Sequence, residues 1–302
     1  MKTVTVFTPT YNRGYCIEKL YRSLCRQTSK DFVWLVIDDG STDNTRDKMN
    51  MYINEGILEI RYVYQLNAGK HVAHNNGVEL CDTELFIDVD SDDYLIDNAI
   101  EIIISKNIHT KKDVVLGYCY RKTDENEKKV ASEYPSNISK CGLCDLYHKY
   151  GFIGDTALVF KTKLIKGHHI PSYDGERFAP ESILYNELNS IAPMVLCEEG
   201  IYICNYLDDG YTKNTNKLMV NNPCGYATYF HSESYYGNGF LYKGKLYGQY
   251  LGMCETNKIK KESLVLSKKP SLIYRLAGRV LLSHYSNFFS NLKKSIIGDS
   301  KT

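Results

Sequence analysis

Three aspartates stand at positions 88, 90 and 92 of this 302-residue chain, and a fourth follows at 93. Carboxylates this close repel one another, and each raises the pKa of its neighbours unless a cation neutralises them. Oxygen ligands of this kind suit Mg²⁺ or Mn²⁺, which usually takes further ligands from substrate phosphates. In extended chain the first and third residues of Asp90-Ser91-Asp92 point the same way. The spacing therefore favours a metal that holds a diphosphate.

An isolated Asp-X-Asp motif does not by itself define a metal site. It is more often a polar turn whose carboxylates cap the helix that follows. A calcium-binding helix-loop-helix needs Gly at its sixth position and Glu at its twelfth, whereas counting from Asp88 gives Asp93 and Ala99. A phosphatase with an aspartyl nucleophile would carry its motif after the first predicted strand, and here the motif follows the fourth. The surrounding elements must decide between these alternatives.

Strands and helices are predicted to alternate through the first hundred residues. The predicted strands are 3–8, 32–38, 57–65 and 84–88. The predicted helices are 15–27, 41–51, 70–80 and 97–106. This alternation is typical of parallel βαβ units, in which ligands bind beyond the carboxyl ends of the strands. Polar clusters follow the four strands at 8–11, 38–41, 66–70 and 88–93, so we expect them to converge on one edge of a sheet.

Four segments in this order resemble the family 2 glycosyltransferases. They are VFTPTYNRG (6–14), WLVIDDGSTDNT (34–45), QLNAGKHVAHNNGVEL (65–80) and FIDVDSDDYL (86–95). The resemblance implies the α/β fold called GT-A, a Rossmann-like, mostly parallel sheet flanked by helices, followed here by a helical, Tyr-rich C-terminal extension. It also implies Mg²⁺- or Mn²⁺-dependent inverting transfer from a nucleotide-diphosphate sugar, with a UDP-sugar as the default donor.

The resemblance assigns roles to single residues. Asp90 would contact the ribose and the metal, Asp92 would bind the metal, and Ser91 lies between them in the donor site. The other donor-binding residues that it implies are Thr8, Pro9, Tyr11 and Asp39 around the nucleoside, and Asn67, Gly69, Lys70 and Asn75. Where the family commonly has Arg-Asn, this chain has His74-Asn75, so a titratable ring replaces a permanent cation.

Inverting transfer needs a general base that takes the proton of the acceptor hydroxyl. In the family the base usually comes from a Glu-Asp pair at the start of a helix, and the corresponding residues here are Glu181-Ser182. Because serine alone is a poor base, we assign the role to Glu181, with Glu176 and Asp155 as substitutes. A carboxylate at a helix N-terminus can also be purely stabilising.

The serine at position 182 keeps a second function open, a catalytically inactive sensor or scaffold that binds nucleotide sugars. A sugar nucleotidyltransferase is the nearest rival enzyme. It would need a Gly-rich, basic phosphate loop after the first strand, and residues 8–13 do not form one.

Composition narrows the class of protein and its compartment. With 37 Lys and Arg against 36 Asp and Glu, bulk charge gives no reason to expect a nucleic-acid partner. Ten scattered cysteines resemble reduced thiols more than a disulfide framework, which favours the cytoplasm. Cys141 and Cys144 have the spacing of a zinc or redox pair, but no second pair completes four ligands, so we interpret them as structural. No signal peptide and no apolar run of about 20 residues is visible.

The expected organisation is a catalytic domain over residues 1–210 and an extension over 211–302. Residues 1–100 would bind the nucleotide sugar, and residues 101–210 would supply the base and the acceptor side. The expected acceptor is a nascent surface glycan, such as a capsule or lipopolysaccharide unit, free or lipid-linked. Residues 271–297 mix apolar and basic side chains, which fits either packing on the catalytic domain or peripheral contact with the inner face of the membrane.

Overall fold

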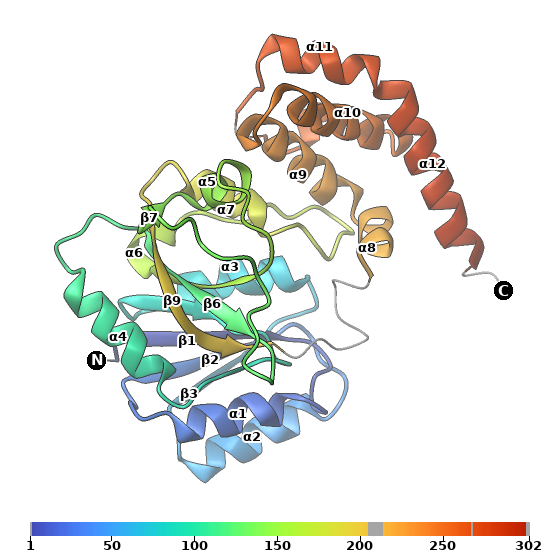
Figure 1. Ribbon diagram of the computed structural model, residues 1–302. Coiled ribbons are helices and arrows are strands. Elements are labelled where there is room, and N and C mark those ends of the chain that lie inside the picture. Colours follow the sequence, from blue (N-terminus) through green and yellow to red (C-terminus); the bar gives the residue numbers. More distant parts are fainter. Residues whose placement is uncertain (1, 205–213, 267, 300–302) are drawn as a thin grey trace. The chain divides into compact units, whose positions relative to one another are not determined.

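The computed structural model describes residues 2–204, 214–266 and 268–299 (Figure 1). Its contacts divide the chain into two units. The first contains residues 1–169 and 188–207, and the second contains residues 170–187 and 208–302. The predicted boundary between residues 210 and 211 lies outside the described residues and stays a prediction.

One mixed sheet forms the centre of the first unit. Its strands are β1 (Val4–Thr10), β2 (Phe32–Asp38), β3 (Ile60–Tyr64), β4 (Leu85–Asp88), β5 (Tyr94–Leu95), β6 (Gly117–Thr123), β7 (Lys140–Cys141), β8 (Thr156–Lys161) and β9 (Met194–Ile203). Their order in space is β3-β2-β1-β4-β8-β6-β9-β5, and β7 pairs with β9. Strands β3, β2, β1 and β4 run parallel, whereas β8 is antiparallel to both β4 and β6. The predicted parallel half of the sheet is therefore confirmed.

Helices cover both faces of this sheet (Figure 1). In the first unit they are α1 (Ile17–Arg26), α2 (Thr45–Glu55), α3 (Lys70–Leu80), α4 (Ala99–His109), α5 (Leu143–His148) and α6 (Thr162–Ile165). Val6 and Trp34 share one buried cluster with Leu20 of α1 and Met49 of α2. Strands β1 and β2 are buried along their whole length, which is why their sequences are nearly continuous apolar runs.

Helix α3 packs on the opposite face of the sheet from α1 and α2. A Cβ on Gly77 would lie 2.4 Å from the ring of Phe7, so only glycine allows this close approach of helix and strand. The ring of His74 meets the rings of Phe7 and Phe86 edge-on, with centroids 5.9 and 5.8 Å away. The buried ring of His74, at the position where the family commonly has arginine, therefore packs against two phenylalanines.

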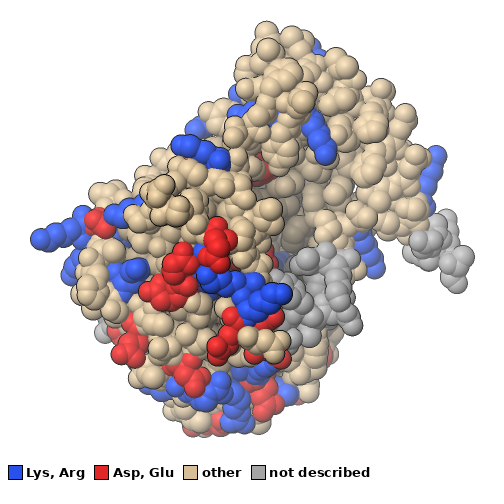
Figure 2. Space-filling view, viewed as in Figure 1, with Lys and Arg blue, Asp and Glu red and all other residues tan. Residues whose placement is uncertain are grey.

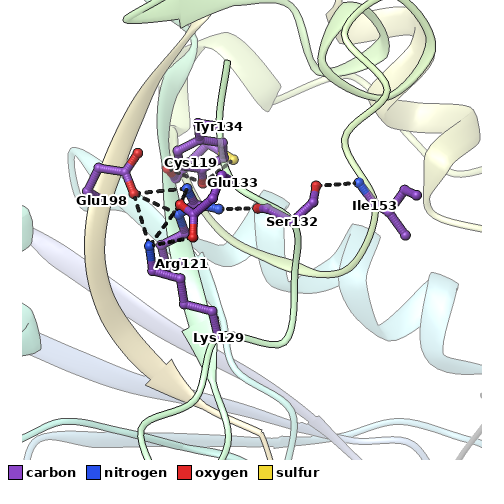
Figure 3. A network of polar contacts seen from close by, with 8 residues as sticks. All are labelled: Cys119, Arg121, Lys129, Ser132, Glu133, Tyr134, Ile153 and Glu198. Atoms are coloured by element: carbon purple, nitrogen blue, oxygen red, sulfur yellow. Dashed lines mark hydrogen bonds and ion pairs between the residues drawn. The ribbon is translucent and has the colours of Figure 1, made fainter. Parts of the chain in front are cut away.

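A buried arginine fastens the polar stretch 122–140 to the sheet (Figure 3). Arg121 of β6 is 1% exposed, and its guanidinium lies 3.6 Å from the ring centroid of Tyr134. Its Nε and Nη2 atoms donate to Glu198 at 3.0 and 2.9 Å, and Nη2 also donates to Glu133 at 3.0 Å. A charge at this depth is tolerated because both its hydrogen bonds and its charge are satisfied. Arg121 therefore holds the polar stretch 122–140 against the sheet.

The second unit is helical and rich in tyrosine, as predicted. Its elements are α7 (Ser182–Leu188), α8 (Thr215–Asn221), α9 (Pro223–Tyr236), α10 (Phe240–Thr256), the 3₁₀ helix η2 (Lys261–Ser263), α11 (Leu272–Val280) and α12 (Leu282–Asp299). Helix α10 is central, and α9, α11 and α12 pack against it. The core between them is largely aromatic and includes Tyr226, Phe230, Tyr250, Tyr285 and Phe289. Among the described residues, no helix is both long enough and apolar enough to cross a membrane.

Residues 170–187 are built into this second unit by polar contacts. Both carboxylate oxygens of Glu176 accept hydrogen bonds from backbone N–H groups at the start of α9, at 2.6 and 2.8 Å. The side-chain oxygen of Asn222 accepts from the backbone N–H groups of Arg177 and Phe178 at 2.7 and 3.0 Å. The stretch that carries the predicted base therefore depends on the C-terminal helices for its conformation.

Candidate active site

The loops that follow β1 and β2 are joined through one asparagine. Asn12 adopts a left-handed conformation with φ of 53°. Its backbone N–H donates to Ser41 Oγ at 2.9 Å, and its Oδ1 accepts from the backbone N–H of Thr42 at 2.8 Å. The backbone N–H of Gly14 donates to Asp43 at 3.0 Å. The first two polar clusters thus form one structure at the edge of the sheet.

Asp39 organises the third cluster. Its Oδ1 accepts from Gln65 Nε2 and from the backbone N–H of Ala68 at 2.7 and 2.8 Å, and its Oδ2 accepts from the N–H of Gly69 at 2.8 Å. Gly69 has φ of 100°, which favours glycine over any other residue. Asp39 is 4% exposed, so the loop before α3 is held by hydrogen bonds to a buried carboxylate.

The third and fourth clusters meet in an ion pair. Lys70, the first residue of α3, places its Nζ 2.7 Å from Oδ1 of Asp90. Burial alone would raise the pKa of Asp90, but the ammonium groups of Lys70 and Lys122 hold it below its ordinary value. Burial and the charge of Asp90 together raise the pKa of Asp92. The two carboxylates are therefore electrostatically different, although they are only two residues apart.

Two residues that sequence reasoning missed complete the acidic site. The hydroxyl of Tyr202, on β9, accepts from the backbone N–H of Asp90 at 3.0 Å and donates to Oδ2 of Asp93 at 2.7 Å. The ammonium of Lys122, on β6, lies 4.0 Å from the ring centroid of Tyr202. Burial opposes the charge of Lys122, but Asp90 and Asp93 raise its pKa above the ordinary value. For Lys122, the one signal in the sequence was a lysine near the end of a largely apolar strand segment.

The other predicted donor-binding residues differ in their surroundings. Thr8 is buried, and its Oγ1 accepts a hydrogen bond from the indole N–H of Trp34 at 3.0 Å, so its side chain faces the core. Tyr11 lies beyond the end of β1 with 48% of its surface exposed. Four further predicted residues are buried or half-buried, namely Pro9, Asn67, Asn75 and Ser91. Printed contacts join Asp39 to Gly69 and Lys70 to Asp90, whereas the Thr8 side chain faces the core, and the roles of all these residues remain predictions.

The three carboxylates considered as the base lie in different places. Glu181 precedes α7 in the second unit, where its Oε2 accepts from the hydroxyl of Tyr185 at 3.0 Å and its backbone carbonyl accepts from the N–H of Leu184 at 2.9 Å. Glu176, in the same unit, is committed to the start of α9. Asp155 precedes β8 in the first unit. Burial lowers the pKa of Lys122, and the charge of Asp155 is a smaller contributor than that of Asp90 to raising it.

A metal at this site would rely on few protein ligands. In the described part of the chain, no three or more His, Cys, Asp or Glu side chains are grouped as a metal site. Mg²⁺ commonly takes one or two carboxylates and completes its shell with water and substrate phosphates, so Asp90 and Asp92 suffice in number and chemistry. The donor set therefore fits a metal that arrives with a diphosphate.

A histidine and a cysteine pair elsewhere in the chain could also be considered as metal ligands. His231 is buried in the helical unit, with its ring centroid 5.0 Å from that of Tyr250, and burial lowers its pKa to about 4. Burial raises the pKa of Cys141 to about 12, which disfavours the thiolate that a zinc or redox site needs. Cys141 and Cys144 therefore match the structural interpretation of this pair.

Comparisons with known proteins agree with this geometry. A family model described as Glycosyl transferase family 2 matches residues 5–167, more than half of the chain. The chain is 28% identical over 193 residues to the GalNAc(5)-diNAcBac-PP-undecaprenol beta-1,3-glucosyltransferase of Campylobacter jejuni, a match that covers 62% of this chain and 60% of that protein. The chain spans 69%, 38% and 28% of the length of three other curated relatives that it matches.

Two solved structures share the fold along almost the whole chain. Residues 1–349 of Staphylococcus aureus TarS, in complex with UDP-GlcNAc, superimpose with a TM-score of 0.63 at 18% identity, covering 99% of this chain and 92% of that one. The mannosyltransferase PcManGT from Pyrobaculum calidifontis, in complex with GDP-Man and Mn²⁺, gives a TM-score of 0.53 at 16% identity, covering 97% and 84%. These similarities confirm the predicted GT-A fold.

Proposed function

The chain belongs to glycosyl transferase family 2, and we propose that it is a metal-dependent, inverting enzyme that transfers a sugar from a nucleotide-diphosphate donor to a hydroxyl group. One observation carries this proposal. The Lys70–Asp90 ion pair joins two polar clusters at the carboxyl edge of the sheet, with Asp92 and Lys122 close by. Alternating cations and carboxylates at this edge suit a diphosphate and its divalent metal.

Each side chain of the site would have a distinct task. Asp90 and Asp92 would hold Mg²⁺ or Mn²⁺, which stabilises the departing diphosphate. Lys70 and Lys122 would offer their ammonium groups to phosphate oxygens. Tyr202 would keep the acidic turn in one conformation through its two hydrogen bonds. The loop that Asp39 holds would border the nucleoside.

The identity of the donor is part of the proposal. The TarS structure contains UDP-GlcNAc, and the PcManGT structure contains GDP-Man with Mn²⁺. We favour a UDP-sugar with Mn²⁺ or Mg²⁺ for this chain, since the fold is shared and Asp90 and Asp92 supply suitable oxygen ligands.

The acceptor substrate and the general base are supported by fewer observations than the donor site. The printed name of the Campylobacter jejuni relative describes a saccharide linked to undecaprenyl diphosphate. We extend this to a nascent surface glycan, free or lipid-linked, reached from the cytoplasmic side of the membrane. Glu181 is the proposed base, and Asp155 is the alternative because it lies in the same unit as Asp90.

A donor panel tests the proposal. The protein is incubated with nucleotide sugars and Mn²⁺, and released nucleotide is measured. We expect release from one donor, its loss with a chelator, and a decrease of about a hundredfold or more in Asp92→Asn. Asp82→Asn serves as the matched control, because Asp82 lies in a surface ion pair with Arg61 at 2.8 Å, away from the acidic site.

Each other outcome points to a defined alternative. Binding of a nucleotide sugar without release from any donor would favour the inactive sensor. Synthesis of a nucleotide sugar from a sugar phosphate and a nucleoside triphosphate would favour the nucleotidyltransferase. Release that persists in the presence of the chelator and in Asp92→Asn would refute the metal site.

The proposed base has its own test. Glu181→Gln should abolish transfer and leave donor binding intact, because the amide cannot take a proton from the acceptor hydroxyl. Transfer and donor binding are measured side by side in Glu181→Gln and Asp155→Asn. If only Asp155→Asn loses transfer, Asp155 is the base.

A further inference from the structure

Helix α11 turns its apolar side outward. Leu272, Ile273, Leu276 and Val280 are 62%, 54%, 49% and 81% exposed. The opposite side of the helix faces α10, where a Cβ on Gly278 would lie 2.8 Å from the backbone nitrogen of Gly248. A helix on a protein surface normally buries its apolar stripe and exposes its polar one. Here large apolar side chains lie on the exposed side, next to the exposed Arg279, while the small residue Gly278 is buried.

The exposed apolar surface continues onto the start of α10. Phe240 and Leu241 are 47% and 81% exposed. The ring of Phe240 lies 5.8 Å from that of Tyr274 on α11, so the start of α10 lies beside α11. We name this set the α11 surface; it consists of Phe240, Leu241, Leu272, Ile273, Leu276 and Val280. A cluster of large exposed apolar residues marks an interaction site.

The stretch of sequence that contains α11 carries charges of one sign. Between residues 263 and 298 the sequence contains no Asp or Glu, whereas it contains Lys268, Lys269, Arg275, Arg279, Lys293 and Lys294. Lys268, Lys269 and Arg279 are exposed. In Figure 2 the outer part of the helical unit is tan with separate blue side chains. The binding partner must therefore combine an apolar phase with negative charge.

We propose that the α11 surface docks the protein on a bilayer of anionic phospholipid. The apolar side chains would enter the boundary between headgroups and acyl chains, while the flanking lysines and arginines contact the headgroup phosphates. A second copy of the chain fits less well, because its equivalent surface would bring the same cations into contact. This inference does not depend on the proposed sugar transfer, since it rests on residues of the second unit alone.

Vesicle flotation of the full chain tests the proposal. We expect binding to phosphatidylcholine vesicles that contain phosphatidylglycerol, and little binding to phosphatidylcholine alone. The triple variant Leu272→Ser/Leu276→Ser/Val280→Ser should lower the partition coefficient at least about tenfold, because each buried CH₂ contributes. Lys268→Gln/Lys269→Gln should lower it about tenfold on anionic vesicles and reduce its salt dependence.

Matched controls and a second measurement keep the outcome clear. Ile108→Ser/Val114→Ser removes two apolar side chains of similar exposure, 65% and 83%, from the first unit, and should bind vesicles like the wild type. Circular dichroism and donor hydrolysis confirm that each variant is folded. Wild-type binding that equals the triple variant's, or sedimentation showing a dimer that the triple variant abolishes without any vesicle binding, would overturn the proposal.

Discussion

At the scale of single residues, the aspartates at this edge of the sheet have different environments. Asp39 is buried and accepts three hydrogen bonds from one loop. Asp90 is paired with Lys70, which helps to keep its pKa low, whereas the pKa of Asp92 is raised by partial burial and by the charge of Asp90. An Asp-X-Asp motif therefore gains its meaning from its neighbours, and those neighbours lie far apart in the sequence.

Tyr202 gives a first prediction. Tyr202→Phe removes one hydroxyl that serves both Asp90 and Asp93, so the buried carboxylate of Asp93 loses a donor. We expect the free energy of unfolding to fall by about 1–3 kcal/mol, and donor binding in the presence of Mn²⁺ to weaken. Urea unfolding and donor titration measure the two effects.

Tyr52→Phe is the matched control for Tyr202→Phe. The hydroxyl of Tyr52 is also buried, but it has no hydrogen-bond partner among the described residues. Its removal should be neutral or slightly stabilising. Equal effects of the two substitutions would contradict the role given to Tyr202.

His231 gives a prediction about pH. Its pKa in the folded protein is about 4, because burial disfavours the charged ring. The unfolded chain, with a pKa of about 6.5, therefore binds the proton more tightly, and stability is lost as pH falls from about 6.5 towards 4. The expected loss between about pH 6.5 and 5 is on the order of 2 kcal/mol.

Comparison of two variants isolates this effect. His231→Phe keeps a ring near Tyr250 and should unfold with a smaller pH dependence than the wild type. His284→Phe changes an exposed histidine of the same unit and should behave like the wild type. Chemical unfolding at pH 7 and pH 5 gives the differences, and identical pH dependence in all three proteins would show that His231 is not the group that titrates.

At the scale of elements, local patterns predicted most of the first unit. Residues 32–38 and 70–80 match β2 and α3 residue for residue, because an apolar run bounded by acidic residues and a glycine before the helix define them. Helix α5 was missed because its six residues are too few to show a period. The antiparallel direction of β8 was missed because pairing with β4 and β6 is decided by contacts distant in sequence.

The candidate site shows the same limit. The four polar clusters could be placed on one edge from the order of strands, and the hydrogen bonds and the ion pair between them confirm that they meet. Lys122 and Tyr202 could not be found in this way. They come from β6 and β9, whose place in the sheet no local pattern reveals.

Close packing of α10 in the helical unit gives an element-scale prediction. A Cβ on Gly252 would lie 2.6 Å from Cβ of Tyr285 and 2.9 Å from the backbone nitrogen of Ser286, both on α12. Because backbone cannot move aside, Gly252→Ala should destabilise the unit by about 1–3 kcal/mol, despite a gain of about 1 kcal/mol in helix propensity. Lys245→Ala, at an exposed position of α10, should leave the melting temperature nearly unchanged. A more stable Gly252→Ala protein would show that α12 does not pack as described.

At the scale of the whole molecule, the two units are interleaved in sequence. The chain leaves the first unit at residue 169, contributes residues 170–187 to the second, and returns for residues 188–207. The donor-side residues Asp39, Lys70 and Asp90 belong to the first unit, whereas Glu181 belongs to the second. In the proposed function, donor binding would therefore depend on residues of the first unit and the base on a residue of the second, so the two roles can be tested separately.

A truncated chain that ends at residue 207 separates the two functions. It keeps Asp39, Lys70 and Asp90, but residues 170–187 lose Asn222 and the start of α9, which hold them by hydrogen bonds. We expect donor binding to persist and sugar transfer to fall by about a hundredfold or more, since a misplaced base is ineffective. Full-length Asn222→Ala removes two of these contacts without deleting the helices and should lower transfer about tenfold at unchanged donor affinity. Full transfer by the truncated chain would mean that the base lies in the first unit, where Asp155 is the remaining candidate.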